Sequence, residues 1–281
     1  SYGSRGLGDV YKRQVSVGDL FMGAIIPGII LVVCYALYVV IRAYLSPHMA
    51  PSQQVEIVTG RWRIMLTSLL PPFVLISSVL GSILLGIATP TEAAGVGAFG
   101  AIILAISKSS LTKKNLTDAV ETTTEITAMV FMILLGSSIF SLVFRGFGGD
   151  DLITSIFTEL PGGAFGAVLV VMILIFLLGF ILDFIQITLV VVPIVGPALL
   201  MLGVDPIWLG IMIAINLQTS FLTPPFGFAL FYLRGVAPDS LATKDIYRGV
   251  IPFILIQLAV LIALAIFPEL VTALPNAVYG S

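Results

Sequence analysis

The stretch that decides the fold spans residues 163–202 and reads GAFGAVLVVMILIFLLGFILDFIQITLVVVPIVGPALLML. It is apolar except near its centre, where Asp183 and Gln186 interrupt it. Because about 20 apolar residues in a helix span a bilayer, the stretch is long enough for two helical arms. The break between the arms has no Lys or Arg and almost no polar length. This favours a re-entrant hairpin with its tip at membrane depth, although charge placement alone also fits two full crossings.

The rest of the chain has the same apolar character. Of its 281 residues, 58% are hydrophobic and 10% are charged, whereas a soluble domain carries about 25% charged residues. The sequence therefore predicts an all-α polytopic membrane protein embedded in a lipid bilayer. The net charge of −2 offers no basic surface for nucleic acid. The one Cys, Cys34, lies in an apolar run and the one His, His48, lies in a polar loop, so we find no partners for a zinc site or for Cys-His catalysis.

Polar interruptions divide this membrane protein into segments. Residues 1–14 are polar and Gly-rich and resemble a translated sequencing adaptor, so we expect a non-native scar there. We expect a polar connection at residues 145–161 and the hairpin at residues 163–202. A broken helix is expected at residues 207–234. The expected segments are a transmembrane helix with a polar arm at 15–63, scaffold-type transmembrane helices at 64–144, a transport-type segment at 145–238, and a last transmembrane helix with a tail at 239–281.

The broken helix at 207–234 contains an unusual density of oxygen-bearing side chains. Pro224 and Pro225 have no amide hydrogen, so they leave upstream carbonyl groups without their usual donor. Carbonyl and hydroxyl oxygens suit a hard monovalent cation such as Na⁺, which we expect at Thr219 and Thr223. A simple proline kink packed against its neighbours is the alternative. The candidate ion- or substrate-binding residues here are Asn216, Gln218, Thr219, Ser220, Thr223 and Pro224.

Asp183 is the only ionisable residue between Glu159 and Asp205. A charge at the bilayer centre costs about 2.5–3.5 kcal/mol on insertion scales. Its presence therefore predicts a function, either cation binding or stabilisation of a helix end at the hairpin tip. The alternative is an Asx-type turn that only caps the second arm. Gln186 and Thr188 offer neutral oxygens nearby, or they bond to their own backbone.

A short turn at residues 88–91 separates two apolar spans. Thr89 and Pro90 precede Glu92 in an order that favours a helix N-terminus, with proline and an acid in the first turn. We interpret these three residues as a structural turn and not as a ligand site.

Several of these motifs together resemble the large membrane subunit of tripartite ATP-independent periplasmic (TRAP) transporters. The matching pieces are residues 86–94 (GIATPTEAA), 182–188 (LDFIQIT) and 216–227 (NLQTSFLTPPFG). Residues 226–238 (FGFALFYLRGVAP) look like the branch named for mannitol and chloroaromatic compounds. Each motif is weak alone, but their order and spacing are specific, and the resemblance covers residues 15–275.

The resemblance implies an elevator-type, Na⁺-driven importer of small organic anions in the bacterial inner membrane. It also implies two partners, a small four-helix membrane subunit and a periplasmic substrate-binding protein. No cofactor is expected apart from Na⁺ as the coupling ion. Members of the family carry two inverted repeats, each with one hairpin and one broken helix. This sequence shows one of each, so we expect the second inverted repeat alone, which would not transport by itself.

Two other functions compete with this interpretation. An ATP-driven importer is one, because residues 92–94 (EAA) resemble the loop that docks an ATPase, although Ala98 stands where that loop has glycine. An intramembrane enzyme is the other, but the acids are not paired at a spacing that suits acid–base catalysis.

Overall fold

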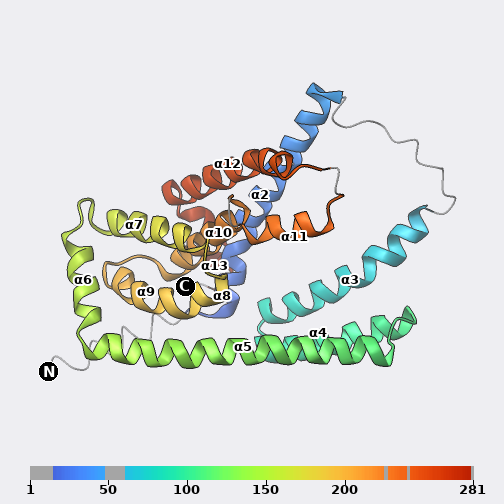
Figure 1. The fold of residues 1–281 in the computed structure, drawn as a ribbon, viewed down its shortest axis with the longest axis horizontal. Helices are drawn as coiled ribbons and strands as arrows, with labels where there is room; N and C mark the ends of the chain where they lie inside the picture. Colours follow the sequence, from blue (N-terminus) through green and yellow to red (C-terminus); the bar gives the residue numbers. More distant parts are fainter. Residues whose placement is uncertain (1–14, 48–60, 225–226, 239–240, 280–281) are drawn as a thin grey trace. The chain divides into compact units, whose positions relative to one another are not determined.

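The computed structural model describes residues 15–47, 61–224, 227–238 and 241–279 (Figure 1). Every regular element in these ranges is a helix, and six helices are long and apolar enough to cross a membrane. The predicted all-α membrane fold is therefore confirmed. The expected scar at 1–14 lies outside the described residues, as does most of the polar arm.

The six long helices are α2 (Val17–Leu45), α3 (Arg61–Leu84), α4 (Pro90–Ser107), α5 (Lys113–Gly146), the continuous helix Phe184–Met201 and α12 (Thr243–Ile266). The continuous helix consists of α8 (Phe184–Gln186), the π-helical turn η2 (Ile187–Val191) and α9 (Val192–Met201). The shorter helices are α6 (Gly149–Glu159), α7 (Gly163–Leu178), α10 (Pro206–Leu222), α11 (Phe228–Val236) and α13 (Glu269–Tyr279).

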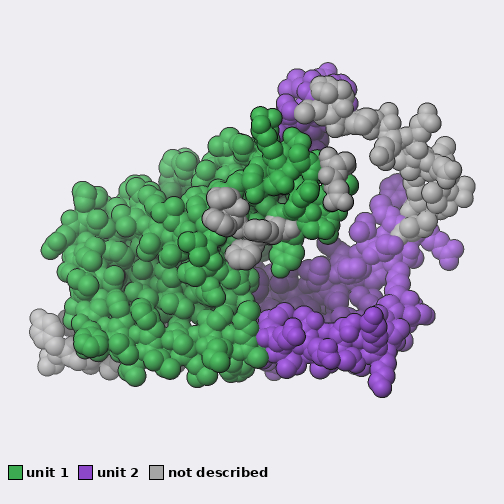
Figure 2. All heavy atoms as spheres, in the orientation of Figure 1, with its two compact units in different colours: residues 1–15, 23–37, 128–281 green, residues 16–22, 38–127 purple. Residues whose placement is uncertain are grey.

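The chain forms two compact units (Figure 2). Of the described residues, the larger unit, green in the figure, takes its members from 15, 23–37 and 128–279, and the smaller, purple unit from 16–22 and 38–127. The chain passes between the units inside α2 and inside α5, and not at the ends of these helices.

The smaller unit is built on the pairing of α3 with α4. Gly100 of α4 permits their close approach, because a Cβ there would lie 2.4 Å from Leu75 Cδ1. Most other apolar side chains of these two helices are exposed, as expected of surfaces that face lipid or other membrane helices. At the start of α4, Thr89 and Glu92 form a reciprocal capping box with Pro90 in the first turn. The Thr89 amide donates to Glu92 Oε2 at 2.8 Å, and the Glu92 amide donates to Thr89 Oγ1 at 3.4 Å.

The larger unit has its core where α7, α10 and α12 pack together (Figure 1). α10 lies at the centre, with buried residues on nearly all sides. Trp208 of α10 donates its indole N–H to the carbonyl of Leu264 in α12 at 2.8 Å. That carbonyl would ordinarily accept from the amide four residues on, but residue 268 is proline and has no N–H. The indole therefore pairs a carbonyl that the helix itself cannot satisfy.

Residues 145–161 contain the helix α6, where the sequence predicted only a polar connection. α6 meets α7 at a bend of 117° (Figure 1). Its apolar residues recur at helical spacing, and Phe157 among them is buried in the core. Asp150 and Asp151 lie in its first turn, where the helix dipole favours acids. Because its acids make the segment polar overall, the amphipathic helix was not predicted from the sequence.

Candidate functional site

The hairpin predicted at 163–202 has two helical arms joined by a short non-helical segment. α7 ends at Leu178, and the second arm begins at Phe184. Local backbone hydrogen bonds hold this segment. The Gly179 amide donates to the Ile175 carbonyl at 2.9 Å, and the Leu182 amide donates to the Leu178 carbonyl at 2.8 Å. Local bonds of this kind permit a chain break among apolar surroundings.

Asp183 and Gln186 lie at the start of the second arm and bond to local backbone. Asp183 Oδ1 accepts from the Phe184 amide at 2.7 Å, and Gln186 Oε1 accepts from the Asp183 amide at 3.4 Å. Together they form a capping box. This is the capping geometry named as the alternative for Asp183. It does not prevent the carboxylate from also facing a cation.

The second break follows α10, which ends at Leu222, and α11 begins at Phe228. Pro225 and Phe226 lie outside the described residues. Pro224 cannot donate to the Ser220 carbonyl, and the Thr223 amide bonds to it instead at 3.1 Å. Thr223 Oγ1 in turn donates to the Thr219 carbonyl at 2.8 Å. A single threonine thus pairs two carbonyls at the end of α10, one with its amide and one with its hydroxyl.

Three predicted site residues of α10 are buried. Asn216 Nδ2 donates to the carbonyl of Met172 in α7 at 2.8 Å, so this residue ties the broken helix to the first hairpin arm. Thr219 Oγ1 donates to the Ile215 carbonyl at 2.7 Å, and Ser220 Oγ donates to the Leu217 carbonyl at 2.8 Å. Each hydroxyl oxygen keeps its capacity to accept a hydrogen bond or to ligate a cation.

The structure brings the two breaks together. A Cβ on Gly179, at the hairpin break, would lie 2.2 Å from Ser220 Oγ at the end of α10. The rings of Phe184 and Phe221, one beside each break, meet edge to face with centroids 6.1 Å apart. Two interruptions about 40 residues apart in sequence therefore occupy one place in the larger unit.

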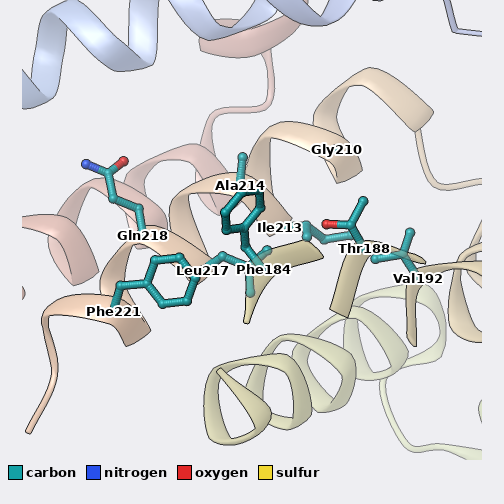
Figure 3. Close-up of a pocket in the computed structure, with 9 residues that line it drawn as sticks. All are labelled: Phe184, Thr188, Val192, Gly210, Ile213, Ala214, Leu217, Gln218 and Phe221. Atoms are coloured by element: carbon teal, nitrogen blue, oxygen red, sulfur yellow. The ribbon is translucent and has the colours of Figure 1, made fainter. Parts of the chain in front are cut away.

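A pocket of about 410 Å³ lies between the second hairpin arm and α10 (Figure 3). Thr188 and Gln218 are the polar side chains among its described lining, and none of these lining residues is charged. Both had been predicted as site residues. The other lining residues were not predicted, because they are apolar residues in an apolar chain: Phe184, Val192, Gly210, Ile213, Ala214, Leu217 and Phe221. Only the positions of the two phenylalanines, each beside a break, could have singled them out.

Comparison with known proteins identifies the family. The family model described as the tripartite ATP-independent periplasmic transporter, DctM component, matches residues 7–270. The sialic acid TRAP transporter large permease protein SiaM of Vibrio cholerae is 29% identical over 275 residues, 95% of this chain and 62% of that protein. The C4-dicarboxylate TRAP transporter large permease protein DctM of Pseudomonas aeruginosa is 29% identical over 266 residues, 94% of this chain and 61% of its own length.

A third relative is the ectoine/5-hydroxyectoine TRAP transporter large permease protein UehC of Ruegeria pomeroyi, 29% identical over 261 residues, 92% of this chain and 59% of that protein. The chain thus spans about three fifths of the length of these relatives. The resemblance to the large membrane subunit of TRAP transporters is confirmed, whereas the mannitol/chloroaromatic branch stays a prediction. The ATP-driven importer and the intramembrane enzyme are set aside. The chain belongs to the DctM-component family of TRAP transporters, whose members are multi-pass inner-membrane transport proteins and not enzymes.

Proposed function

We propose that the chain supplies the hairpin and the broken helix of a Na⁺-coupled importer of small organic anions. A periplasmic substrate-binding protein would deliver the anion, and a small four-helix membrane subunit would complete the membrane complex. The observation that carries the proposal is the meeting of the two breaks, with Gly179 against Ser220 and a pocket beside them. Secondary transporters bind substrate and coupling ions where discontinuous helices meet within the membrane.

The second break favours a monovalent cation. Hydroxyl and carbonyl oxygens gather there within one helical turn, from Thr219 to Thr223. Neutral oxygen ligands suit a hard cation of low charge such as Na⁺. We therefore assign Thr219 and Thr223 as its ligands, with Ser220 beside them.

The charge beside the pocket favours joint binding of cation and anion. Asp183 immediately precedes Phe184 of the pocket wall, and the described lining holds no basic side chain. A carboxylate would repel an organic anion across a medium of low dielectric constant. A bound Na⁺ would offset that repulsion, so substrate affinity should rise with Na⁺ concentration.

The proposal is tested by reconstituting the complete transporter that contains this chain into liposomes. We expect uptake of a labelled organic acid only when an inward Na⁺ gradient and the binding protein are both present. ATP added to either side should have no effect. Uptake that persists without Na⁺ and without the binding protein would refute the proposal, and an ATP requirement would do the same.

A further inference from the structure

A second hollow lies between α7, α10 and α12 and shares no lining residue with the pocket beside the helix breaks. Its volume is about 310 Å³, and apolar side chains line it, among them Met172, Met212 and Leu261. The one polar side-chain group in this described lining is the indole N–H of Trp208, which already donates to the Leu264 carbonyl. The hollow therefore fits hydrocarbon and offers nothing to a polar ligand.

The hollow continues into a smaller one of about 240 Å³ at the start of α10. The two form one groove, which we call the α7–α12 groove, because they share four lining residues: Phe165, Val168, Trp208 and Ala265. Phe165 is exposed, so the groove opens on the surface of the larger unit. Asp205 lines one end and is the one charged side chain in the described lining of either hollow. The groove is thus apolar along its length and acidic at one end, which matches the two parts of an amphiphile.

The acidic end of the groove lies beside the borders of three helices. α7 begins at Gly163, α10 begins at Pro206 and α12 ends at Ile266. Glu159 and Glu269 follow just outside two of these borders in the sequence. Because a charge at the bilayer centre is costly, apolar helices that end together beside acids end near the membrane surface. A phospholipid in the groove would therefore have its head group at the acidic end.

Asp205 has a carboxylate oxygen available for such a head group. Its Oδ1 accepts from the Trp208 amide at 2.8 Å and caps α10, whereas Oδ2 has no partner among the described residues, and the residue is exposed. The sequence has no Lys or Arg at 146–233 or after residue 248. The basic residues of α12, Lys244 and Arg248, lie near its start, at the end opposite the groove mouth. No basic side chain of these helices therefore offsets the negative charge of Asp205.

The head group decides which lipid the groove prefers. An acyl chain comes from a bilayer that is as apolar as the groove, so it gains close packing but no hydrophobic driving force. Asp205 repels the anionic head group of phosphatidylglycerol. The quaternary ammonium of phosphatidylcholine has no N–H, whereas the primary ammonium of phosphatidylethanolamine has three, as a lysine side chain does. Hydrogen bonds between oppositely charged groups are the strong ones, so Asp205 selects the ethanolamine lipid.

We propose that the α7–α12 groove binds an acyl chain of phosphatidylethanolamine, whose ammonium group donates to Asp205 Oδ2. The bound lipid fills the space between three helices of the core and connects the starts of α7 and α10 to the end of α12. This inference does not depend on the transport function proposed above.

Native mass spectrometry of the complete transporter that contains this chain tests the head group. After equilibration with equal amounts of phosphatidylethanolamine, phosphatidylcholine and phosphatidylglycerol, we expect the ethanolamine lipid to be retained in excess. Asp205→Asn keeps the cap, because asparagine Oδ1 can still accept from the Trp208 amide, and it removes the charge. An exposed ion pair changes affinity by about fivefold at most, so the excess should fall by up to that factor. Asp151→Asn is the control, since Asp151 is an exposed acid of α6 outside the groove lining. An excess that is unchanged in Asp205→Asn, or a preference for phosphatidylglycerol, would overturn the proposal.

Ala265→Leu tests the site of the acyl chain. Ala265 lines both hollows, so the larger side chain fills the groove and should lower the retained phosphatidylethanolamine by one molecule per copy of this chain. Ala101→Leu adds the same groups at an exposed position of α4 and should leave that number unchanged. Equal retention by the two variants would contradict the site, as would a density map of the complete transporter in which protein side chains fill the groove.

Discussion

The two helix breaks of the larger unit satisfy their backbone in different ways. The hairpin break pairs its amides with nearby carbonyls and then begins a helix capped by Asp183. The break after α10 forms where Pro224 has no N–H, and Thr223 pairs the Ser220 carbonyl with its amide and the Thr219 carbonyl with its hydroxyl. The first break is therefore a closed turn that depends on close packing, and the second is an oxygen-rich helix end. We expect packing changes to harm the first most and oxygen changes to harm the second most.

The largest effect is expected where the breaks touch. Gly179→Ala places a methyl group 2.2 Å from Ser220 Oγ and 2.8 Å from Ser220 Cβ. Overpacking of this kind destabilises a protein by about 1–3 kcal/mol, so the Tm of the complete transporter should fall and uptake with it. Gly136→Ala in α5 is the matched control, because a Cβ there meets nothing within 4 Å. Equal Tm values for the two variants would show that the breaks do not pack as described.

Thr223→Val tests the oxygen-rich break. Valine keeps the shape of the side chain and removes the hydroxyl that bonds to the Thr219 carbonyl. If that oxygen also ligates Na⁺, a loss of about 1.4 kcal/mol raises the Na⁺ concentration for half-maximal uptake about tenfold. Thr158→Val is the control, since Thr158 is an exposed residue of α6 and its hydroxyl likewise donates to the carbonyl four residues before it, that of Thr154, at 3.0 Å. A Na⁺ curve that does not move, measured per folded transporter, would leave the hydroxyl as a local cap only.

Asp183 allows the charge and the cap to be separated. Asp183→Ala removes the cap and should destabilise the protein by about 1 kcal/mol. Asp183→Asn can still accept from the Phe184 amide, so its Tm should stay near that of the unmodified protein. We expect the asparagine variant to need more Na⁺ for uptake, because the carboxylate contributes to cation binding. Uptake by this variant that is unchanged at every Na⁺ concentration would reduce Asp183 to a cap.

The smallest effect concerns a carbonyl in the second hairpin arm. Ser137 of α5 donates its hydroxyl to the carbonyl of Leu189, whose usual donor position is taken by Pro193. Ser137→Ala should therefore destabilise the protein by about 0.5–1.5 kcal/mol. Ser138 bonds within its own helix at 2.7 Å, so Ser138→Ala should change stability by less than about 0.5 kcal/mol. Indistinguishable denaturation midpoints would mean that the Ser137 bond to the Leu189 carbonyl adds nothing measurable to stability.

The sequence was informative where polar residues interrupt an apolar background. Asp183 and Pro224 locate both breaks, and Thr89, Pro90 and Glu92 locate the start of α4. The packing role of a predicted residue was harder to foresee, since Asn216, a predicted ligand residue, also donates its Nδ2 to the Met172 carbonyl. The contact of Gly179 with Ser220 could not be predicted, because it depends on how helices separated in sequence pack.

The bond from Trp208 to the Leu264 carbonyl gives the molecule an intrinsic optical reporter. The chain has two tryptophans, and they differ sharply: Trp208 is 9% exposed in the core, whereas Trp62 is 74% exposed. Trp62→Phe would leave Trp208 as the one tryptophan of this chain, and Trp208 lies where α10 meets α12. Its fluorescence would shift to longer wavelength if that contact opened to water. The spectrum of such a variant could follow the separation of α10 and α12 without an attached dye.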